Sequence, residues 1–203
     1  MDALTLDPIR RLDGEVVLPG SKSLANRALL LGALCQGQTR LRGVPDGDDV
    51  RHMRRALGAL GVRVEHEAEA VVVAGCGGRF PARQAALQLG NSGTSMRLLA
   101  ASVCLGRGRY TLDGVARMRQ RPIGDLVEGL RQLGAEVAYL GDEGFPPLQV
   151  NAGGLPGGRA RVRGAASSQF LSALLLAAPL ADAPVRLEVA GELVSAPHVE
   201  MTL

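Results

Sequence analysis

Aromatic side chains are scarce in this sequence, and their scarcity disfavours one broad class of function. Aromatic residues make up 2% of the 203 residues, and tryptophan is absent. Proteins that bind single-stranded nucleic acid stack bases on aromatic rings. The chain also lacks a block of lysines and arginines that could follow a phosphate backbone. We therefore do not expect a nucleic-acid partner.

Cysteine, histidine and long apolar runs are also in short supply. Cys35, Cys76 and Cys104 are widely spaced and form no C-x-x-C motif, which favours reduced thiols over a disulfide framework. The three histidines form no pair at metal-ligand spacing, so we expect no metal site. The apolar run near residues 170–181 is too short to span a bilayer, and residues 1–14 lack the apolar core of a signal peptide. These features predict a cytoplasmic protein that does not enter a membrane.

The composition that remains is that of a globular protein with a small excess of positive charge. Hydrophobic residues make up 46% of the chain and charged residues 21%, which is enough apolar material for a buried core. The formal net charge is +3. Such a mild excess suits small anionic ligands.

The stretch LPGSKSLANRALLLGALCQG, residues 18–37, joins a turn to the start of an apolar helix. Lys22 and Arg27 fall in the first helical turns, and Ser21 and Ser23 add hydroxyl groups. Unpaired backbone N–H groups and the positive end of the helix dipole attract anions at such a place. Taken alone, the stretch fits a capped helix with two solvated cations equally well.

The same order of elements returns twice along the chain. LGNSGTSMRLLAASVCLG, residues 89–106, is another glycine turn that enters an apolar helix, and residues 162–181 contain a third. The turn glycines Gly20, Gly90 and Gly164 lie 70 and 74 residues apart. Repetition at this period predicts β-α-β-α-β-β units. We expect the units at about residues 15–84, 85–158 and 159–203, the third of them incomplete.

The polarity patterns predict which layer of the fold is buried. The first helix of each unit is apolar on nearly all sides, as is typical of a buried helix. The strands expected at Thr39–Gly43 and Val185–Val189 alternate polar and apolar residues, so one face of each sheet should meet water. We therefore expect an α/β domain of the α+β kind, with buried helices inside and solvent-facing sheets outside. A doubly wound fold has the opposite arrangement.

Local signals predict several boundaries. Glu15–Leu18 has the pattern of a strand that leads into the first turn. Asp46 and Asp48 are candidate N-caps for the next helix, and Gly61 is expected to end that helix in the left-handed conformation. Pro122 is expected in the first turn of the second unit's amphipathic helix.

Three turns, one in each unit, supply hydroxyls, glycines and cations that suit phosphates or carboxylates. Each turn alone also fits a helix cap with a solvated arginine. A P-loop does not match, because Ser21 separates Gly20 from Lys22, and no dinucleotide-binding glycine motif is present. Because the repeat brings equivalent turns to one end of the domain, we expect a single pocket. Its candidates are Ser21, Lys22, Ser23 and Arg27; Asn91, Ser92, Gly93, Thr94 and Arg97; Ser167, Ser168 and Gln169; and Arg121 before a fourth helix.

Four motifs closely resemble those of the 5-enolpyruvylshikimate-3-phosphate (EPSP) synthase family in order and spacing. They are LPGSKSLANRALLLGAL, LGNSGTSMR, RMRQRPIGDLVEGLRQLGAEV and SSQFLSALLLAAPLA. The resemblance runs from about Glu15 to Leu203 and covers the first half of a family member. It implies an inside-out α/β barrel-like domain at residues 15–203, a second domain that is absent here, and a lead-in at residues 1–14 that pairs with that second domain.

The resemblance also implies an activity on the route to chorismate and the aromatic amino acids. The family transfers the enolpyruvyl group of phosphoenolpyruvate (PEP) to the 5-hydroxyl of shikimate 3-phosphate, releases phosphate, and uses no metal or organic cofactor. Its proton-transferring carboxylates lie in the other half, so no catalytic residue is assigned to this chain. We expect weak binding of shikimate 3-phosphate and no turnover by this chain alone, with the C-terminal half-domain, in the same or a separate chain, as its partner.

By the same resemblance, ligand contacts fall on particular residues of this chain. Shikimate 3-phosphate would be held by Lys22, Ser23, Arg27, Ser167, Ser168, Gln169 and Ser195, and PEP by Lys22, Gly93, Arg121 and Gln169. Gly93 matches the form of the family that is sensitive to the PEP mimic glyphosate.

Three positions depart from the family pattern, and two alternatives remain open. Leu98 stands where many members have proline, while Ala196 and His198 replace a basic residue and a tyrosine at the edge of the shikimate site. One alternative is UDP-N-acetylglucosamine enolpyruvyl transferase, which the S-K-S-x-x-x-R and S-S-Q motifs and the absence of cysteine from the Val115–Gln120 loop disfavour. The other is a non-catalytic or split-enzyme module that binds anions.

Overall fold

The computed structural model describes residues 3–165 and 167–203 of the chain. Its helices are α1 (Lys22–Leu34), α2 (Asp48–Ala59), α3 (Gly93–Ser102), α4 (Gly124–Gln132), α5 (Ser168–Ala177) and α6 (Ala196–Glu200). Its strands are β1 (Gln38–Arg42), β2 (Val64–Glu67), β3 (Ala70–Ala74), β4 (Gln84–Gln88), β5 (Arg107–Asp113), β6 (Glu136–Tyr139), β7 (Leu148–Gly153), β8 (Gly158–Arg163) and β9 (Val185–Ala190). Short 3₁₀ turns cover Val103–Leu105, Met118–Gln120 and Ala178–Leu180.

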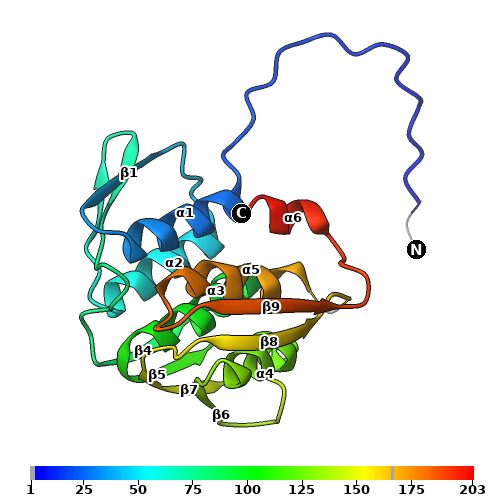
Figure 1. Cartoon of the computed structure of the whole chain (residues 1–203). Helices are drawn as coiled ribbons and strands as arrows, with labels where there is room; N and C mark the ends of the chain where they lie inside the picture. Colours follow the sequence, from blue (N-terminus) through cyan, green and yellow to red (C-terminus); the bar gives the residue numbers. More distant parts are fainter. Residues whose placement is uncertain (1–2, 166) are drawn as a thin grey trace.

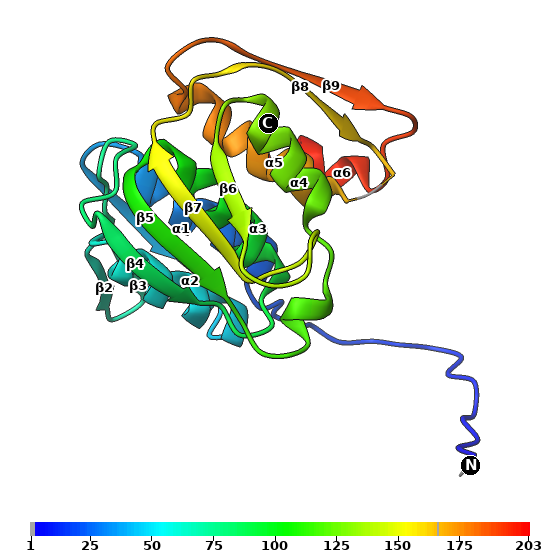
Figure 2. The same cartoon turned by 90° about the horizontal axis from the view of Figure 1, so that it is seen from below.

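The strands form three separate sheets around a group of helices (Figure 1). The sheets have the orders β1-β3-β2, β4-β5-β7-β6 and β8-β9. In the second and third sheets the strand before the buried helix pairs in parallel with the strand after it, β4 with β5 across α3 and β8 with β9 across α5. The remaining pairs are antiparallel. Figure 2, seen from below, shows the β4-β5-β7-β6 sheet lying over α3.

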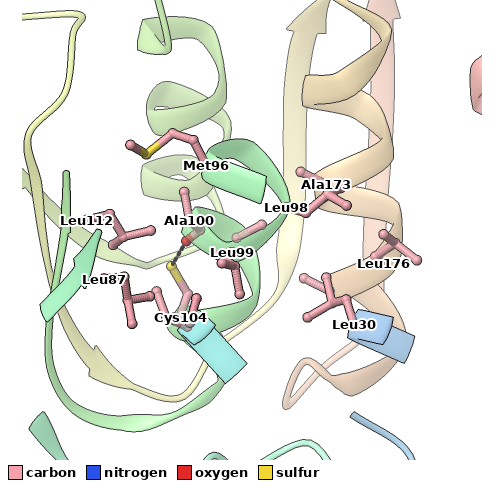
Figure 3. Packing of buried hydrophobic residues seen from close by; sticks show 14 of the residues in the cluster. Leu30, Leu87, Met96, Leu98, Leu99, Ala100, Cys104, Leu112, Ala173 and Leu176 are labelled. Carbon is pink, nitrogen blue, oxygen red and sulfur yellow. Dashed lines mark hydrogen bonds between the residues drawn. The ribbon is translucent and has the colours of Figure 1, made fainter. Parts of the chain in front are cut away.

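The middle of the molecule is helical, as the apolar patterns predict. Every residue of α3 is buried, and α3 packs along α5 and against α1. Figure 3 shows Leu98 on the side of α3 that faces Ala173 of α5, and Leu87 and Leu112 of the sheet on the other side. The Leu98 side chain is 1% exposed, so at this departure from the family pattern it serves as core packing.

The outer strands alternate in burial, as expected for sheets with one wet face. In β8, Ala160 and Val162 are buried, whereas the arginines on either side of Val162 are exposed. The same alternation is seen in β1 and through most of β9. The mixed α/β fold, with helices inside and sheets outside, is therefore confirmed.

Close approach of backbone segments draws the helix-opening turns toward one end of the domain. A Cβ atom on Gly20 would overlap the carbonyl oxygen of Gly43, the turn that follows β1. A Cβ on Gly164 would lie 2.6 Å from the carbonyl oxygen of Glu192, in the equivalent turn after β9. Only glycine permits such contacts. The turns before α1 and α5 are thus packed directly against the turns that follow the next strand.

Three expectations about local structure are wrong. Glu15–Leu18 forms no strand, because among the described residues no strand pairs with it, and its apolar side chains lie exposed on the extended segment that leads to α1 (Figure 1). Neither Asp46 nor Asp48 caps α2; the N-cap is Gly47, and both carboxylates accept hydrogen bonds from Arg51 instead.

Pro122 lies before α4 rather than in its first turn. The N-cap is Ile123, whose backbone N–H donates to the carbonyl of Gly144 at 2.8 Å. The carbonyl of Pro122 accepts a hydrogen bond from Arg97, so tertiary contacts hold this segment outside the helix. The expected left-handed end of α2 is confirmed, since Gly61 follows its C-cap with φ +85°. Within the described residues, every helix is too short or too polar to cross a membrane.

Leu29→Ala tests whether the helical centre carries the stability of the fold. Leu29 is 0% exposed, so we expect the free energy of unfolding to fall by about 2–5 kcal/mol, because the substitution leaves a cavity. Leu31, in the same helix, is 42% exposed, and Leu31→Ala should cost about 1 kcal/mol or less. Urea unfolding of both variants measures the difference, and equal losses would contradict a core centred on the helices.

Candidate functional site

The amino-terminal ends of α1, α3 and α5 lie around adjoining hollows at one end of the domain. The first, here called the α1–α3 cavity, has a volume of about 480 Å³ and is lined by Lys22, Ser23, Asp48, Asp49, His52, Asn91, Gly93, Thr94, Arg121 and Gln169. The second, the α4–α5 cavity, measures about 520 Å³ and is lined by Arg97, Arg121, Pro122, Asp125, Arg163, Ala165, Ser167, Gln169 and Phe170. Arg121 and Gln169 line both. Residues far apart in the sequence thus share one polar surface.

Lys22 enters the α1–α3 cavity from the first residue of α1. Ser21, the N-cap, accepts a hydrogen bond from the backbone N–H of Leu24 at 3.4 Å. The Lys22 Nζ atom pairs with Oδ2 of Asp49 at 2.7 Å. Asp49 lies in the first turn of α2, where the helix dipole favours a carboxylate. Sequence reasoning missed Asp49, and its place among the acidic residues that open α2 was the available signal.

Gly93 and Arg121 meet at the start of α3. The N-cap Ser92 accepts a hydrogen bond from the backbone N–H of Ser95 at 3.3 Å. The Arg121 Nη1 atom donates to the carbonyl of Asn91 at 2.9 Å, which holds the guanidinium over the turn. A Cβ atom on Gly93 would overlap the side-chain nitrogens of Arg121 and Arg97. Glycine at this position therefore lets two guanidinium groups approach the same helix end.

An ion pair shapes the loop that carries Arg121. The Asp113 carboxylate accepts two hydrogen bonds from Arg119, at 3.0 and 2.6 Å, and one from the backbone N–H of Gly114 at 2.7 Å. Hydrogen bonding by Arg119 is the main cause that holds the pKa of Asp113 below its ordinary value. These contacts hold the loop between β5 and α4 against the end of β5.

Gln169 reaches both cavities from the first turn of α5. The N-cap Ser167 accepts a hydrogen bond from its backbone N–H at 3.2 Å. Its side-chain Oε1 accepts from Nη1 of Arg97 at 2.9 Å, and its Nε2 donates to Oγ1 of Thr94 at 3.3 Å. Gln169 therefore links the start of α5 to the start of α3.

Three of the residues that family resemblance assigns to the ligands line neither cavity, and neither do the pocket candidates Ser21 and Ser92, which cap α1 and α3. Arg27 is 4% exposed and donates to the side chains of Thr202 and Ser172 and to the carbonyls of Ser23 and His198, and burial lowers its pKa. It ties α1 to α5 and α6. Ser168 is buried in the first turn of α5. Ser195 is exposed at the start of α6, in the left-handed conformation with φ +55°.

The arrangement is suited to binding anions. Helix N-termini, a lysine, arginines and a carboxamide face shared hollows, and hydrogen bonds to charged groups are stronger than neutral ones. Within the described residues, no three His, Cys, Asp or Glu side chains gather as metal ligands would.

Comparison with known proteins gives a consistent result. The family model for EPSP synthase (3-phosphoshikimate 1-carboxyvinyltransferase) matches residues 6–203. The 3-phosphoshikimate 1-carboxyvinyltransferases of Vibrio vulnificus (strain YJ016) and Shewanella oneidensis are 53% and 52% identical over 206 residues, which is 100% of this chain and 48% of each relative. The chain therefore spans about half the length of the curated relatives it matches.

A solved structure agrees with the sequence comparison. EPSP synthase from Acinetobacter baumannii superimposes with a TM-score of 0.79 and 31% sequence identity, over 92% of this chain and 42% of that chain. The family model covers nearly the whole chain, and the curated relatives share about half of their aligned residues with it. The chain belongs to the EPSP synthase family.

Proposed function

We propose that this chain supplies one half of the substrate site of a 3-phosphoshikimate 1-carboxyvinyltransferase. The observation that carries the proposal is the grouping of Lys22, Gly93, Arg121 and Gln169 around one cavity. These residues come from the starts of α1, α3 and α5 and from the segment before α4, and they are the set that family resemblance assigns to PEP. The whole enzyme would transfer the enolpyruvyl group of PEP to the 5-hydroxyl of shikimate 3-phosphate and release phosphate.

Both substrates carry several negative charges, and bringing them together requires fixed positive groups. Lys22 and Arg121 would offset this repulsion, and each charged hydrogen bond contributes about 1.5–3 kcal/mol. Fixed donors need little reorganisation when charge develops during the reaction. Holding both substrates side by side also replaces a collision between two molecules by a reaction within one complex.

The shikimate 3-phosphate contacts divide into two groups. Lys22, Ser23 and Gln169 line the α1–α3 cavity, and Ser167 and Gln169 line the α4–α5 cavity, so these residues support the assignment. Arg27, Ser168 and Ser195 remain proposed contacts on the family motif alone. The proton-transferring carboxylates would come from the C-terminal half-domain, which we propose as the partner of this chain.

Two further properties belong to the same proposal. The reaction would take place in the cytoplasm, which the three free cysteines support. The complete enzyme would be inhibited by glyphosate, because Gly93 leaves the side chains of Arg121 and Arg97 close to the start of α3.

Separating binding from turnover tests the proposed half-site. We expect shikimate 3-phosphate to release or absorb heat on binding in calorimetry, with no phosphate release when PEP is added to the chain alone. Mixing the chain with the C-terminal half of the Vibrio vulnificus relative should produce phosphate release, with that half alone as the control. Phosphate release by this chain alone, or the absence of binding to shikimate 3-phosphate, would contradict the proposal.

Gly93→Ala tests the close approach at the start of α3. The new methyl group would displace the Arg121 guanidinium, so in the reconstituted mixture we expect the KM for PEP to rise by about tenfold, equivalent to about 1.4 kcal/mol. Gly58→Ala is the matched control, because a Cβ at Gly58 in α2 meets no atom within 4 Å. Steady-state kinetics of both variants would show the difference. An unchanged KM for PEP in Gly93→Ala would contradict the assignment of Arg121 to the PEP site.

A further inference from the structure

Arg97 joins three segments of the site through a single buried guanidinium. Its side chain starts on α3 and is 8% exposed. Nη1 donates to Oε1 of Gln169 on α5 at 2.9 Å, and Nη2 donates to the carbonyl of Pro122 at 3.2 Å, next to Arg121. The guanidinium also lies over the ring of Phe170, 5.3 Å from its centre.

This burial is unfavourable for the folded domain. The Nε atom of Arg97 is buried and has no hydrogen-bond partner in the described part of the chain. Desolvation and the like charge of Arg121 lower the pKa of Arg97 to about 10. A buried cation that lacks a carboxylate partner costs stability. Strongly perturbed groups of this kind concentrate at functional sites.

The chemistry of the guanidinium fixes the orientation of the Gln169 carboxamide. An arginine side chain carries only donors, so the atom of Gln169 that faces Arg97 must be the oxygen. The NH₂ group then points the other way, toward Thr94, whose Oγ1 accepts one of its two N–H bonds at 3.3 Å. Gln169 and Thr94 both line the α1–α3 cavity. Among the described residues, Nε2 of Gln169 donates to Thr94 alone, so its second N–H is available as a donor at the cavity.

We propose that Arg97 is a positioning residue that orients the Gln169 carboxamide, so that Gln169 donates a hydrogen bond to an oxyanion in the α1–α3 cavity. Without Arg97, the carboxamide could rotate and present its oxygen, which would repel the same ligand. The identity of that ligand as shikimate 3-phosphate rests on the proposed function, whereas the orientation of Gln169 in the unliganded chain does not.

Arg97→Met separates positioning from a purely structural role. Methionine keeps an unbranched side chain beside Phe170 and removes the buried charge, which favours the fold, but it also leaves Gln169 Oε1 and the Pro122 carbonyl without their donor. Because these effects oppose each other, we expect the melting temperature to change by no more than about 5 °C. The Kd for shikimate 3-phosphate should weaken by about tenfold, a loss typical of a hydrogen bond to a charged group. Arg186→Met, on the exposed strand β9, removes the same charge and should leave the Kd within about twofold.

NMR of the unliganded chain tests the orientation directly. The side-chain amide resonances of Gln169, assigned by their loss in Gln169→Ala, should shift in Arg97→Met and stay unchanged in Arg186→Met. Unchanged resonances in Arg97→Met would overturn the positioning role. This result does not depend on the binding of shikimate 3-phosphate, so it can be told apart from a failure of the proposed function. Loss of folding in Arg97→Met would overturn it as well, because a structural role would then explain the residue.

A double-mutant cycle distinguishes positioning from simple attraction between Arg97 and the ligand. In the Gln169→Ala background we expect Arg97→Met to change the Kd for shikimate 3-phosphate by less than about twofold, because the group that Arg97 orients is gone. The same tenfold loss in both backgrounds would show that Arg97 acts by its charge alone and would overturn the proposal.

Discussion

Two arginines that form no ion pair with the described residues, Arg97 and Arg121, are the constraint on which the candidate site depends. Lys22 has a carboxylate partner in Asp49, but Arg97 and Arg121 approach the same end of α3, and the charge of Arg121 adds to the burial of Arg97 in lowering the pKa of Arg97. Hydrogen bonds to Asn91, Pro122 and Gln169 hold the two guanidinium groups in place despite their mutual repulsion. An anion that enters the cavity would relieve it. The site is thus organised before a ligand arrives.

The buried helices make this arrangement rigid. Because α3 is surrounded by α1, α5 and the β4-β5-β7-β6 sheet, its amino-terminal end cannot move without disturbing the core. Leu98 packs on the α5 side, and Leu99 is 0% exposed. The 3₁₀ turn Val103–Leu105 that follows α3 is equally enclosed, since Cys104 is 2% exposed and its Sγ donates to the carbonyl of Ala100. This burial raises the pKa of the Cys104 thiol to about 12. Packing along the helices therefore sets the distances among the groups at their starts.

Periodicity predicted the layers of this fold, because a helix that is apolar all round and a strand that alternates are local signals. The strand predicted at Glu15–Leu18 was wrong, because strand formation requires a partner strand, which no local pattern reveals. Pro122 was misplaced because its carbonyl is held by Arg97, a tertiary contact. The motifs located Lys22, Gly93, Arg121 and Gln169 at shared cavities, but they could not show that Arg27 donates to four groups of the protein itself.

The starts of α1, α3 and α5 must act as one binding site if their shared cavities hold a single ligand. Titrating the ¹⁵N-labelled chain with shikimate 3-phosphate and following backbone amide resonances tests this most directly. We expect resonances of Ser23, Thr94 and Gln169 to shift together and to fit one Kd. Shifts confined to one of the three turns, or different Kd values for the three, would contradict a single site.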